Sequence, residues 1–292
     1  MGLREIIKHH AKGAGRVKGK TRSENDLRNK KTLEDLCVRL ITLFAMDRFG
    51  DYVSDTVIAP VRENSAQTLS ALLLHLPEDV VLKAFNALTK LVKQDIGELG
   101  IKVPCWEAKH GGMLGLRYFV SVRKDLLFSH PELLDTIINI VLFSLNESDD
   151  DDVQSVAAST LIPIASEFVN LKLDLALQMV NVLWIVLSDL KDDLSASIGS
   201  VMDLLARLCS HKEVLDKMKE YTLTDENYDL KQLIPRLYPF LRHSISNVRK
   251  SVLKTLLAFL NIEDDSFKTW IDGKIFRLLF QNLLVEQNTD VL

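Results

Sequence analysis

The amino-acid sequence predicts an all-α fold in which pairs of helices stack side by side into an elongated α-solenoid. Leu and Val recur at three- and four-residue spacing along most of the chain, which is the period of an amphipathic helix. The 292 residues include only 12 glycines and 7 prolines, and the Asn-Gly dipeptide typical of hairpin turns is absent. We therefore expect helices throughout and no strands.

The expected helices occur in pairs joined by short turns. The first pair has one helix over about 33–46 and its partner over about 60–76, where Pro60 suits a helix start. Further pairs are expected at 78–95 and 106–124, at 131–146 and 152–169, at 172–189 and 193–210, and at 230–243 and 246–261, and a last helix near 266. Within the helix at 106–124, Gly111, Gly112 and Gly115 predict close approach by a neighbouring helix, since glycine is unfavourable in a helix interior.

The second helices of these pairs align with one another. Successive alignment points are separated by 47, 45, 41 and 54 residues when the register is set at Arg62, Lys109, Gln154, Ser195 and Arg249. Steps of about 40 to 47 residues are typical of HEAT and armadillo repeats. We therefore expect 1–292 to form a single solenoid of about five to six such repeats, which begins and ends inside a repeat and so reads as part of a longer protein.

Two polar segments do not fit the helical pattern. Residues 11–31 are basic and nearly free of apolar side chains, so we expect a flexible insertion between repeats. Residues 211–228 look like a polar spacer that lengthens the last repeat step. The Lys and Arg side chains of 11–31 could make a weak, salt-sensitive DNA contact, or the segment could be a solvated loop.

The charge of the chain indicates what kind of partner it binds, and its cysteine content indicates the compartment in which it acts. Residues 1–31 hold ten Lys/Arg and three acidic side chains, which leaves the rest of the chain with a net charge of −11. An acidic body favours a basic protein surface as partner. Three cysteines without paired spacing are typical of a reducing compartment, and no apolar stretch is long enough to span a bilayer, so we expect an intracellular protein.

Three motifs that suggest chemistry lack the context that the chemistry needs. Ala14–Thr21 satisfies a loose phosphate-loop pattern, but a polar helix pattern precedes it where a buried strand is needed. The acidic turn at 147–152 lacks the central glycine of a calcium loop. Cys105 and His110 have no second pair of zinc ligands nearby. We assign no catalytic, cofactor or metal residue in this chain.

Several long blocks resemble one known family. These are DRFGDYVSD at 47–55, APVRE at 59–63, WEAKHGGMLG at 106–115, DDDV at 150–153 and PRLYPFL at 235–241. Together they resemble the HEAT-repeat region of the modifier-of-transcription family, the Swi/Snf-type ATPases that strip TATA-binding protein from promoter DNA. The resemblance extends over nearly the whole chain.

The resemblance implies a binding scaffold. In that family the amino-terminal solenoid grips the convex back of TATA-binding protein through its intra-repeat turns, a latch covers the DNA-binding face, and a carboxy-terminal motor uses ATP on upstream DNA. This chain contains no recognisable motor or latch. We therefore expect a non-catalytic part of a nuclear remodeller, with ATP bound only in the absent motor.

The turns of the solenoid supply the candidate partner-binding residues. Acidic side chains there would complement the basic helices that the family picture places on TATA-binding protein, which would speed docking and fix orientation. The acidic candidates are Asp47, Asp51, Asp55, Glu98, Asp149, Asp150, Asp151, Asp192 and Asp193. Phe49, Tyr52 and Trp106 are candidate anchors, although Trp106 is equally suited to packing between repeats.

Two alternatives remain open from the sequence. A generic HEAT scaffold could bind another protein or a peptide on its concave face, which apolar and asparagine side chains along the second helices would favour. An ATPase that uses Lys20 and Thr21 would bind ATP in this chain itself.

Overall fold

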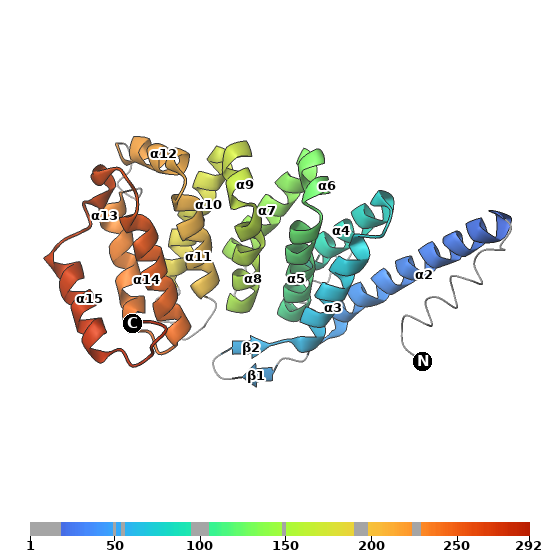
Figure 1. The fold of residues 1–292 in the computed structure, drawn as a ribbon, viewed down its shortest axis with the longest axis horizontal. Helices are drawn as coiled ribbons and strands as arrows, with labels where there is room; N and C mark the ends of the chain where they lie inside the picture. Colours follow the sequence, from blue (N-terminus) through green and yellow to red (C-terminus); the bar gives the residue numbers. More distant parts are fainter. Residues whose placement is uncertain are drawn as a thin grey trace.

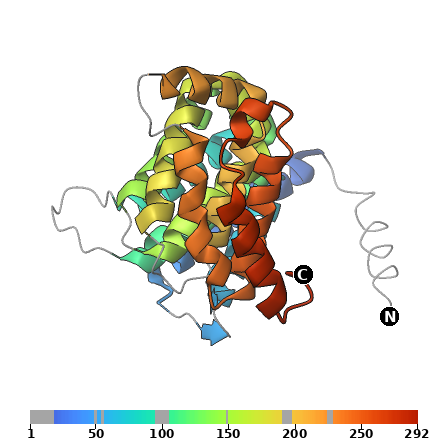
Figure 2. The same ribbon diagram turned by 90° about the vertical axis from the view of Figure 1, so that its left-hand side faces the viewer.

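The helices stack into an elongated solenoid of two layers (Figure 1). The structure, a computed structural model, describes residues 19–48, 51–53, 56–94, 105–147, 150–189, 198–223 and 229–292. Figure 2 looks along the long axis and shows the helices of successive repeats lying behind one another. The predicted all-α solenoid is confirmed. Among the described residues, no helix is long and apolar enough to cross a membrane.

The first layer contains the helix that opens each repeat. Its members are α2 (Gly19–Met46), α4 (Glu78–Lys93), α7 (Pro131–Glu147), α10 (Leu173–Asp189), the short α13 (Leu230–Leu233) with the 3-10 helix η5 (Ile234–Arg242), and α15 (Gly273–Val285). The second layer contains α3 (Pro60–Leu73), α5 (Trp106–Val122), α8 (Asp151–Leu161), α11 (Ile198–Cys209) and α14 (Ser246–Leu260). Each first-layer helix before α15 packs on the second-layer helix that follows it, and second-layer neighbours also pack on one another.

Short helices connect one repeat to the next. These are α6 (Lys124–Ser129), η2 (Ile162–Ile164), α9 (Ala165–Leu171), α12 (Lys212–Thr222) and η6 (Asp265–Lys268). One helix pair cannot bury both of its apolar faces, so stacking is what completes the core. The buried cluster accordingly runs without interruption from Cys37 on α2 to Ile275 on α15.

The glycines of α5 lie where neighbouring helices approach, as predicted. A Cβ added at Gly111 would lie 2.8 Å from the Phe44 Cβ of α2, and one at Gly115 would lie 2.6 Å from Leu88 Cδ2 of α4. Ordinary Cβ atoms do not tolerate such distances. The absence of a side chain therefore lets α5 sit between α2 and α4.

Two of the predicted irregular segments contain helix instead. The prediction of a flexible insertion at 11–31 is wrong from Gly19 onward, because α2 begins there. The amino-terminal part of α2 projects beyond its neighbours (Figure 1). Residues 11–18 lie outside the described part of the chain. A helix already packed over its carboxy-terminal half can propagate through polar residues at little cost. The spacer predicted at 211–228 contains α12, whose Val214, Leu215 and Met218 are buried.

Other boundaries differ for identifiable reasons. The helix predicted over 152–169 breaks into α8, η2 and α9 at Pro163, which cannot donate a helical hydrogen bond. The last helix begins at Gly273 rather than near 266, because the Asp272 carboxylate caps it by accepting bonds from the backbone amides of Lys274 and Ile275 at 2.8 and 3.0 Å. A 3-10 turn occupies 265–268.

The prediction of no strands is also wrong at one turn. Strands β1 (Asp51–Val53) and β2 (Thr56–Ile58) pair antiparallel, with Tyr52 opposite Val57. They form a small hairpin between α2 and α3, and the helices remain the framework of the fold.

Candidate protein-binding edge

In the described residues, the ends at which each first-layer helix leads to its second-layer partner lie along one side of the solenoid, the lower edge in Figure 1. We call this side the intra-repeat edge. In the described residues it is formed by the β1–β2 hairpin, the amino-terminal ends of α5 and α8, and the turn before α14. The inter-repeat helices α6, α9 and α12 lie on the opposite side.

A buried arginine holds the first part of this edge together. Arg62, the third residue of α3, is fully buried and its Nε lies 3.3 Å from Oδ2 of Asp47 at the end of α2. Its Nη1 donates to the Glu107 carbonyl at 3.2 Å and lies 3.2 Å from His110 Nδ1. We call Arg62, Asp47, Trp106 and His110 the Arg62 node. It joins the ends of α2, α3 and α5.

The protonation state of His110 follows from this packing. Burial lowers the pKa of His110 to about 3, and the nearby Arg62 and Arg117 act in the same direction. The imidazole is therefore neutral near pH 7, and its Nδ1 can accept the hydrogen bond from Arg62. Burial lowers the pKa of Arg62 as well, whereas Asp47 and the acids around it raise it.

Two of the predicted contact residues belong to this node. Asp47 is only 8% exposed, so its carboxylate serves Arg62 within the fold rather than the open surface. Trp106 is half-buried, and the Arg62 guanidinium lies 5.1 Å from the centre of its ring. The alternative role foreseen for Trp106, packing between repeats, is what its ring does here. The exposed part of the ring remains at the edge.

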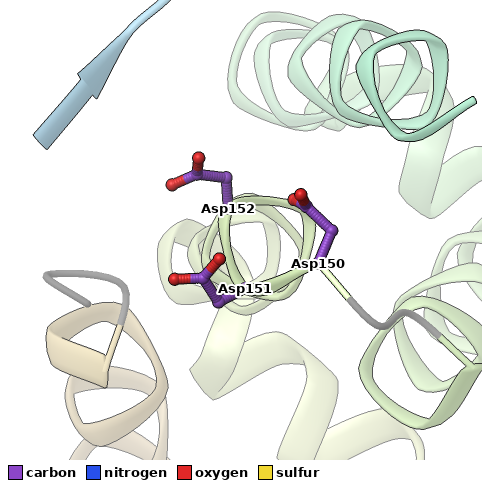
Figure 3. A group of neighbouring side chains, drawn as sticks. All are labelled: Asp150, Asp151 and Asp152. Carbon is purple, nitrogen blue, oxygen red and sulfur yellow. The ribbon is translucent and has the colours of Figure 1, made fainter. Parts of the chain in front are cut away.

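The amino-terminal turn of α8 gathers three carboxylates (Figure 3). Asp150, Asp151 and Asp152 are half-buried, and one oxygen of each lies within 4.8 Å of the others. Asp150 caps α8 by accepting a bond from the Val153 amide at 3.0 Å. Burial raises the pKa of Asp150, although the Val153 amide and Arg62 favour its charged form.

The side chains at the aligned positions of the second helices make similar contacts with neighbouring elements. Arg62 reaches into the node, Gln154 donates to the Leu145 carbonyl at 3.1 Å, and Arg249 donates to the His243 and Ser244 carbonyls at 2.7 and 2.9 Å. The Lys109 ammonium lies 6.0 Å from the Phe143 ring. A long polar side chain at this position therefore tends to tie its helix to the preceding turn.

The remaining candidates are placed only in part. Asp51 and Tyr52 lie in β1, so the hairpin carries them at the intra-repeat edge. The candidates that lie outside the described residues are Phe49, Asp55, Glu98, Asp149, Asp192 and Asp193. Cys105 donates to Glu107 at 3.3 Å whereas His110 faces Arg62, so these two side chains serve different partners. Lys20 and Thr21 lie in the first turn of α2.

Sequence reasoning missed the Arg62 node as a unit. Arg62 was recognised as an alignment point and His110 as an isolated histidine, 48 residues apart in the chain. The sequence feature that could have indicated the node is Arg62 itself. An arginine on an otherwise apolar helix face requires acidic and carbonyl partners when it is buried. Which residues supply those partners depends on how the helices stack.

Comparison with solved structures supports the fold. An engineered protein aligns over 89% of this chain and 92% of its own length with a TM-score of 0.53 and 18% identity. A designed armadillo repeat protein aligns over 89% of this chain and 94% of its own with a TM-score of 0.52 and 14% identity. At these identities the likeness concerns the fold alone.

Comparison with characterised sequences is more specific. Over 293 residues and the whole of this chain, the sequence is 57% identical to the TATA-binding protein-associated factor MOT1 of Saccharomyces cerevisiae. Over its full length the chain therefore matches one segment of TATA-binding protein-associated factors, in line with the resemblance to the modifier-of-transcription family. It is also 38% identical, over its full length, to TATA-binding protein-associated factor 172 of Homo sapiens. The chain spans 16% and 15% of these two relatives, and no family model matches it.

Proposed function

We propose that this segment is a non-catalytic HEAT-repeat scaffold that binds TATA-binding protein through the intra-repeat edge. The observation that carries the proposal is the full-length match to proteins named as TATA-binding protein-associated factors. The segment would act in the nucleus as part of an ATP-driven remodeller that removes TATA-binding protein from promoter DNA. The motor would lie in the part of the protein outside this segment.

The chemistry of the edge supports a basic partner. The α8 turn holds three neighbouring carboxylates, and the hairpin carries Asp51 alongside the aromatic Tyr52. The Arg62 node beneath them fixes the ends of α2, α3 and α5. Acidic groups on a rigid support are suited to steering a basic surface and fixing its orientation.

Capture of TATA-binding protein by the purified chain tests the proposal. Asp151→Lys reverses a charge without removing the α8 cap, whereas Asp150→Asn removes a charge and keeps a capping side chain. Glu213→Lys on α12, at the opposite side of the solenoid, is the matched control. We expect the chain to retain TATA-binding protein, Asp151→Lys to weaken capture about tenfold in a salt-dependent manner, and Glu213→Lys to leave it unchanged.

Two results would contradict the proposal. If the intact chain fails to retain TATA-binding protein, the binding function lies elsewhere in the longer protein. Equal capture by Asp151→Lys and Glu213→Lys would remove the α8 turn from the interface. A labelled ATP analogue that binds the chain and is lost on Lys20→Ala would favour the ATPase alternative.

Binding on the face of the second layer remains the alternative. The exposed asparagines of this layer, Asn64 on α3 and Asn247 on α14, stand near opposite ends of the described chain. Between them Ser155 of α8 donates to Ser200 of α11 at 3.0 Å. Capture of TATA-binding protein that survives changes at the edge and is lost on Gln67→Lys, on the exposed side of α3, would favour this face.

A further inference from the structure

The last repeat contains a strongly basic stretch, although the chain after residue 31 has a net charge of −11. Between residues 230 and 262 there are six Lys/Arg and no Asp or Glu, whereas the whole chain has a net charge of −4. These residues form α13, η5 and α14, which pack on one another at the carboxy-terminal end of the solenoid (Figure 1). The charge is therefore concentrated in space as well as in sequence.

Some of this charge is used within the fold. Arg249 is bound by both carboxylate oxygens of Glu286, at 2.7 and 2.8 Å, and Lys250 lies 3.8 Å from Asp290. Six other basic side chains of the last repeat have no acidic group within 4 Å among the described residues. Lys254 lies on α14, and the other five lie on α13, η5 and α15: Lys231, Arg236, Arg242, Lys274 and Arg277. We call these five the basic patch.

The 3-10 geometry of η5 arranges the arginines in a row. Three residues per turn place Arg236, Pro239 and Arg242 on one face, with about 12 Å between the two arginine positions along the axis. The opposite face is buried through Leu237 and Phe240. Arg236 and Arg242 consequently present their charge to solvent from a fixed backbone.

Helix α15 adds a second row beside the first. Arg242 Nη2 donates to Gln281 Oε1 of α15 at 3.1 Å, which joins the two elements. Lys274 lies seven residues before Gln281, on the same side of α15, and Arg277 follows Lys274 by three residues, close to one turn. Packed helices lie about 8 to 10 Å apart, so the patch has width as well as length.

The carboxylates nearest in sequence to the basic patch cap helices. Asp229 caps α13 by accepting from the Lys231 amide at 2.9 Å, and Asp272 caps α15. Each is thereby held at a helix start, and neither forms an ion pair with the patch within 4 Å among the described residues. The positive charge of the patch is left for an external anion.

We propose that the basic patch binds the phosphate backbone of duplex nucleic acid. Arginine, which supplies three of the five side chains, binds phosphate with two parallel hydrogen bonds. Two rows of charge match a broad polyanion better than a single extended acidic peptide. This inference is independent of the proposed binding to TATA-binding protein.

The test is binding of the full chain to a fluorescent duplex of arbitrary sequence, measured by anisotropy between about 50 and 200 mM salt. The patch variant carries Arg236→Glu, Arg242→Glu and Arg277→Glu. The matched control carries Lys90→Glu, Lys93→Glu and Arg207→Glu, which change the net charge equally at positions without ion pairs among the described residues. Circular dichroism checks that both variants keep the helical fold.

We expect the patch variant to lose at least about tenfold in affinity and the control to lose less than about threefold. The slope of log K against log salt should also fall by about one for each lost phosphate contact. Equal losses in the two variants, or no loss in either, would overturn the proposal.

Two further arms of the experiment distinguish the basic patch from a second basic segment and from a different ligand. A variant with Arg16→Glu, Lys18→Glu and Lys20→Glu tests the basic amino-terminal segment. If that variant alone abolishes duplex binding, the patch is not the site. Tighter binding of poly-glutamate than of duplex at equal charge would show that the patch serves an acidic protein segment, and would also overturn the proposal.

Discussion

Arg62 and Arg249 are aligned residues in the first turns of α3 and α14, each preceded by valine, but they differ in burial and in their partners. Arg62 is fully buried and divides its hydrogen bonds and charge among Asp47, the Glu107 carbonyl and His110. Arg249 keeps 18% of its side-chain surface exposed and forms a two-pronged pair with Glu286. The helix position sets where the side chain points, and the next repeat sets how deeply it is buried.

The difference has an energetic meaning. Removing an ion from water costs several kcal/mol, so a fully buried guanidinium is tolerated only where every partner is in place. The Arg249–Glu286 pair keeps 18% and 8% of the two side-chain surfaces exposed, so water still reaches part of the Arg249 guanidinium. We therefore expect the loss of Arg62 to destabilise its repeat more than the loss of Arg249 destabilises the last repeat.

Replacing Arg62 by methionine should have the largest effect. The change leaves the Asp47 carboxylate, in a residue only 8% exposed, without the ion pair, which typically costs about 3 to 5 kcal/mol. Urea unfolding and hydrogen exchange at the start of α5 would measure it. Arg249→Met is the matched comparison and should cost less, about 1 to 3 kcal/mol, because the Arg249 guanidinium is partly exposed to water. Equal losses would show that burial does not distinguish the two positions.

Protonation of His110 should weaken the node in acid. Its pKa is about 3 in the folded chain and 6.5 ordinarily, so the unfolded chain binds more protons between those values. Stability is then lost as the pH falls from about 6.5 towards 3, by an amount on the order of 2 kcal/mol once local opening is allowed for.

The variant His110→Asn tests this dependence. Asparagine keeps an acceptor for Arg62 and cannot take up a proton, so its urea midpoint should change less with pH in that window. The wild type and Arg249→Met should keep the full dependence. An unchanged pH profile in His110→Asn would assign the acid sensitivity to other groups.

Two glycines, one near each arginine, differ in how closely their neighbours pack against them. Gly111→Ala would press a Cβ against Phe44, including its backbone Cα at 3.1 Å, next to the node. Overpacking of this kind costs about 1 to 3 kcal/mol, against a gain of about 1 kcal/mol in helix propensity. Gly199→Ala, in the second-layer helix beside that of Arg249, would meet only the movable Ser251 side chain, with Oγ at 3.2 Å. Thermal unfolding should show a loss for the first variant and little change for the second.

The repeats could be predicted from the sequence because each helix has its own apolar period. Helix pairing and the glycine contacts of α5 depend on local spacing, and the structure bears them out. The node could not be derived in the same way, because Arg62 and His110 meet only through the stacking of separate helices. The first half of α2 could not be predicted from hydrophobic periodicity either. It is polar, and a helix without an apolar stripe resembles a loop in composition.

The smallest effect should come from Glu286→Gln. Its hydrogen bonds from Arg249 and from the Asn288 amide hold the pKa of Glu286 at about 2, below the ordinary 4.5. The folded chain therefore binds fewer protons than the unfolded one between those values, and the stabilisation that this pair gives is lost as the pH falls from about 4.5 to 2. The variant should shift the melting temperature slightly at pH 7. Between about pH 4.5 and 2, its melting temperature should fall less steeply than that of the wild type. Because His110 acts mainly at higher pH, the double variant His110→Asn, Glu286→Gln should lose both dependences additively, and strong non-additivity would show that the two sites are energetically coupled.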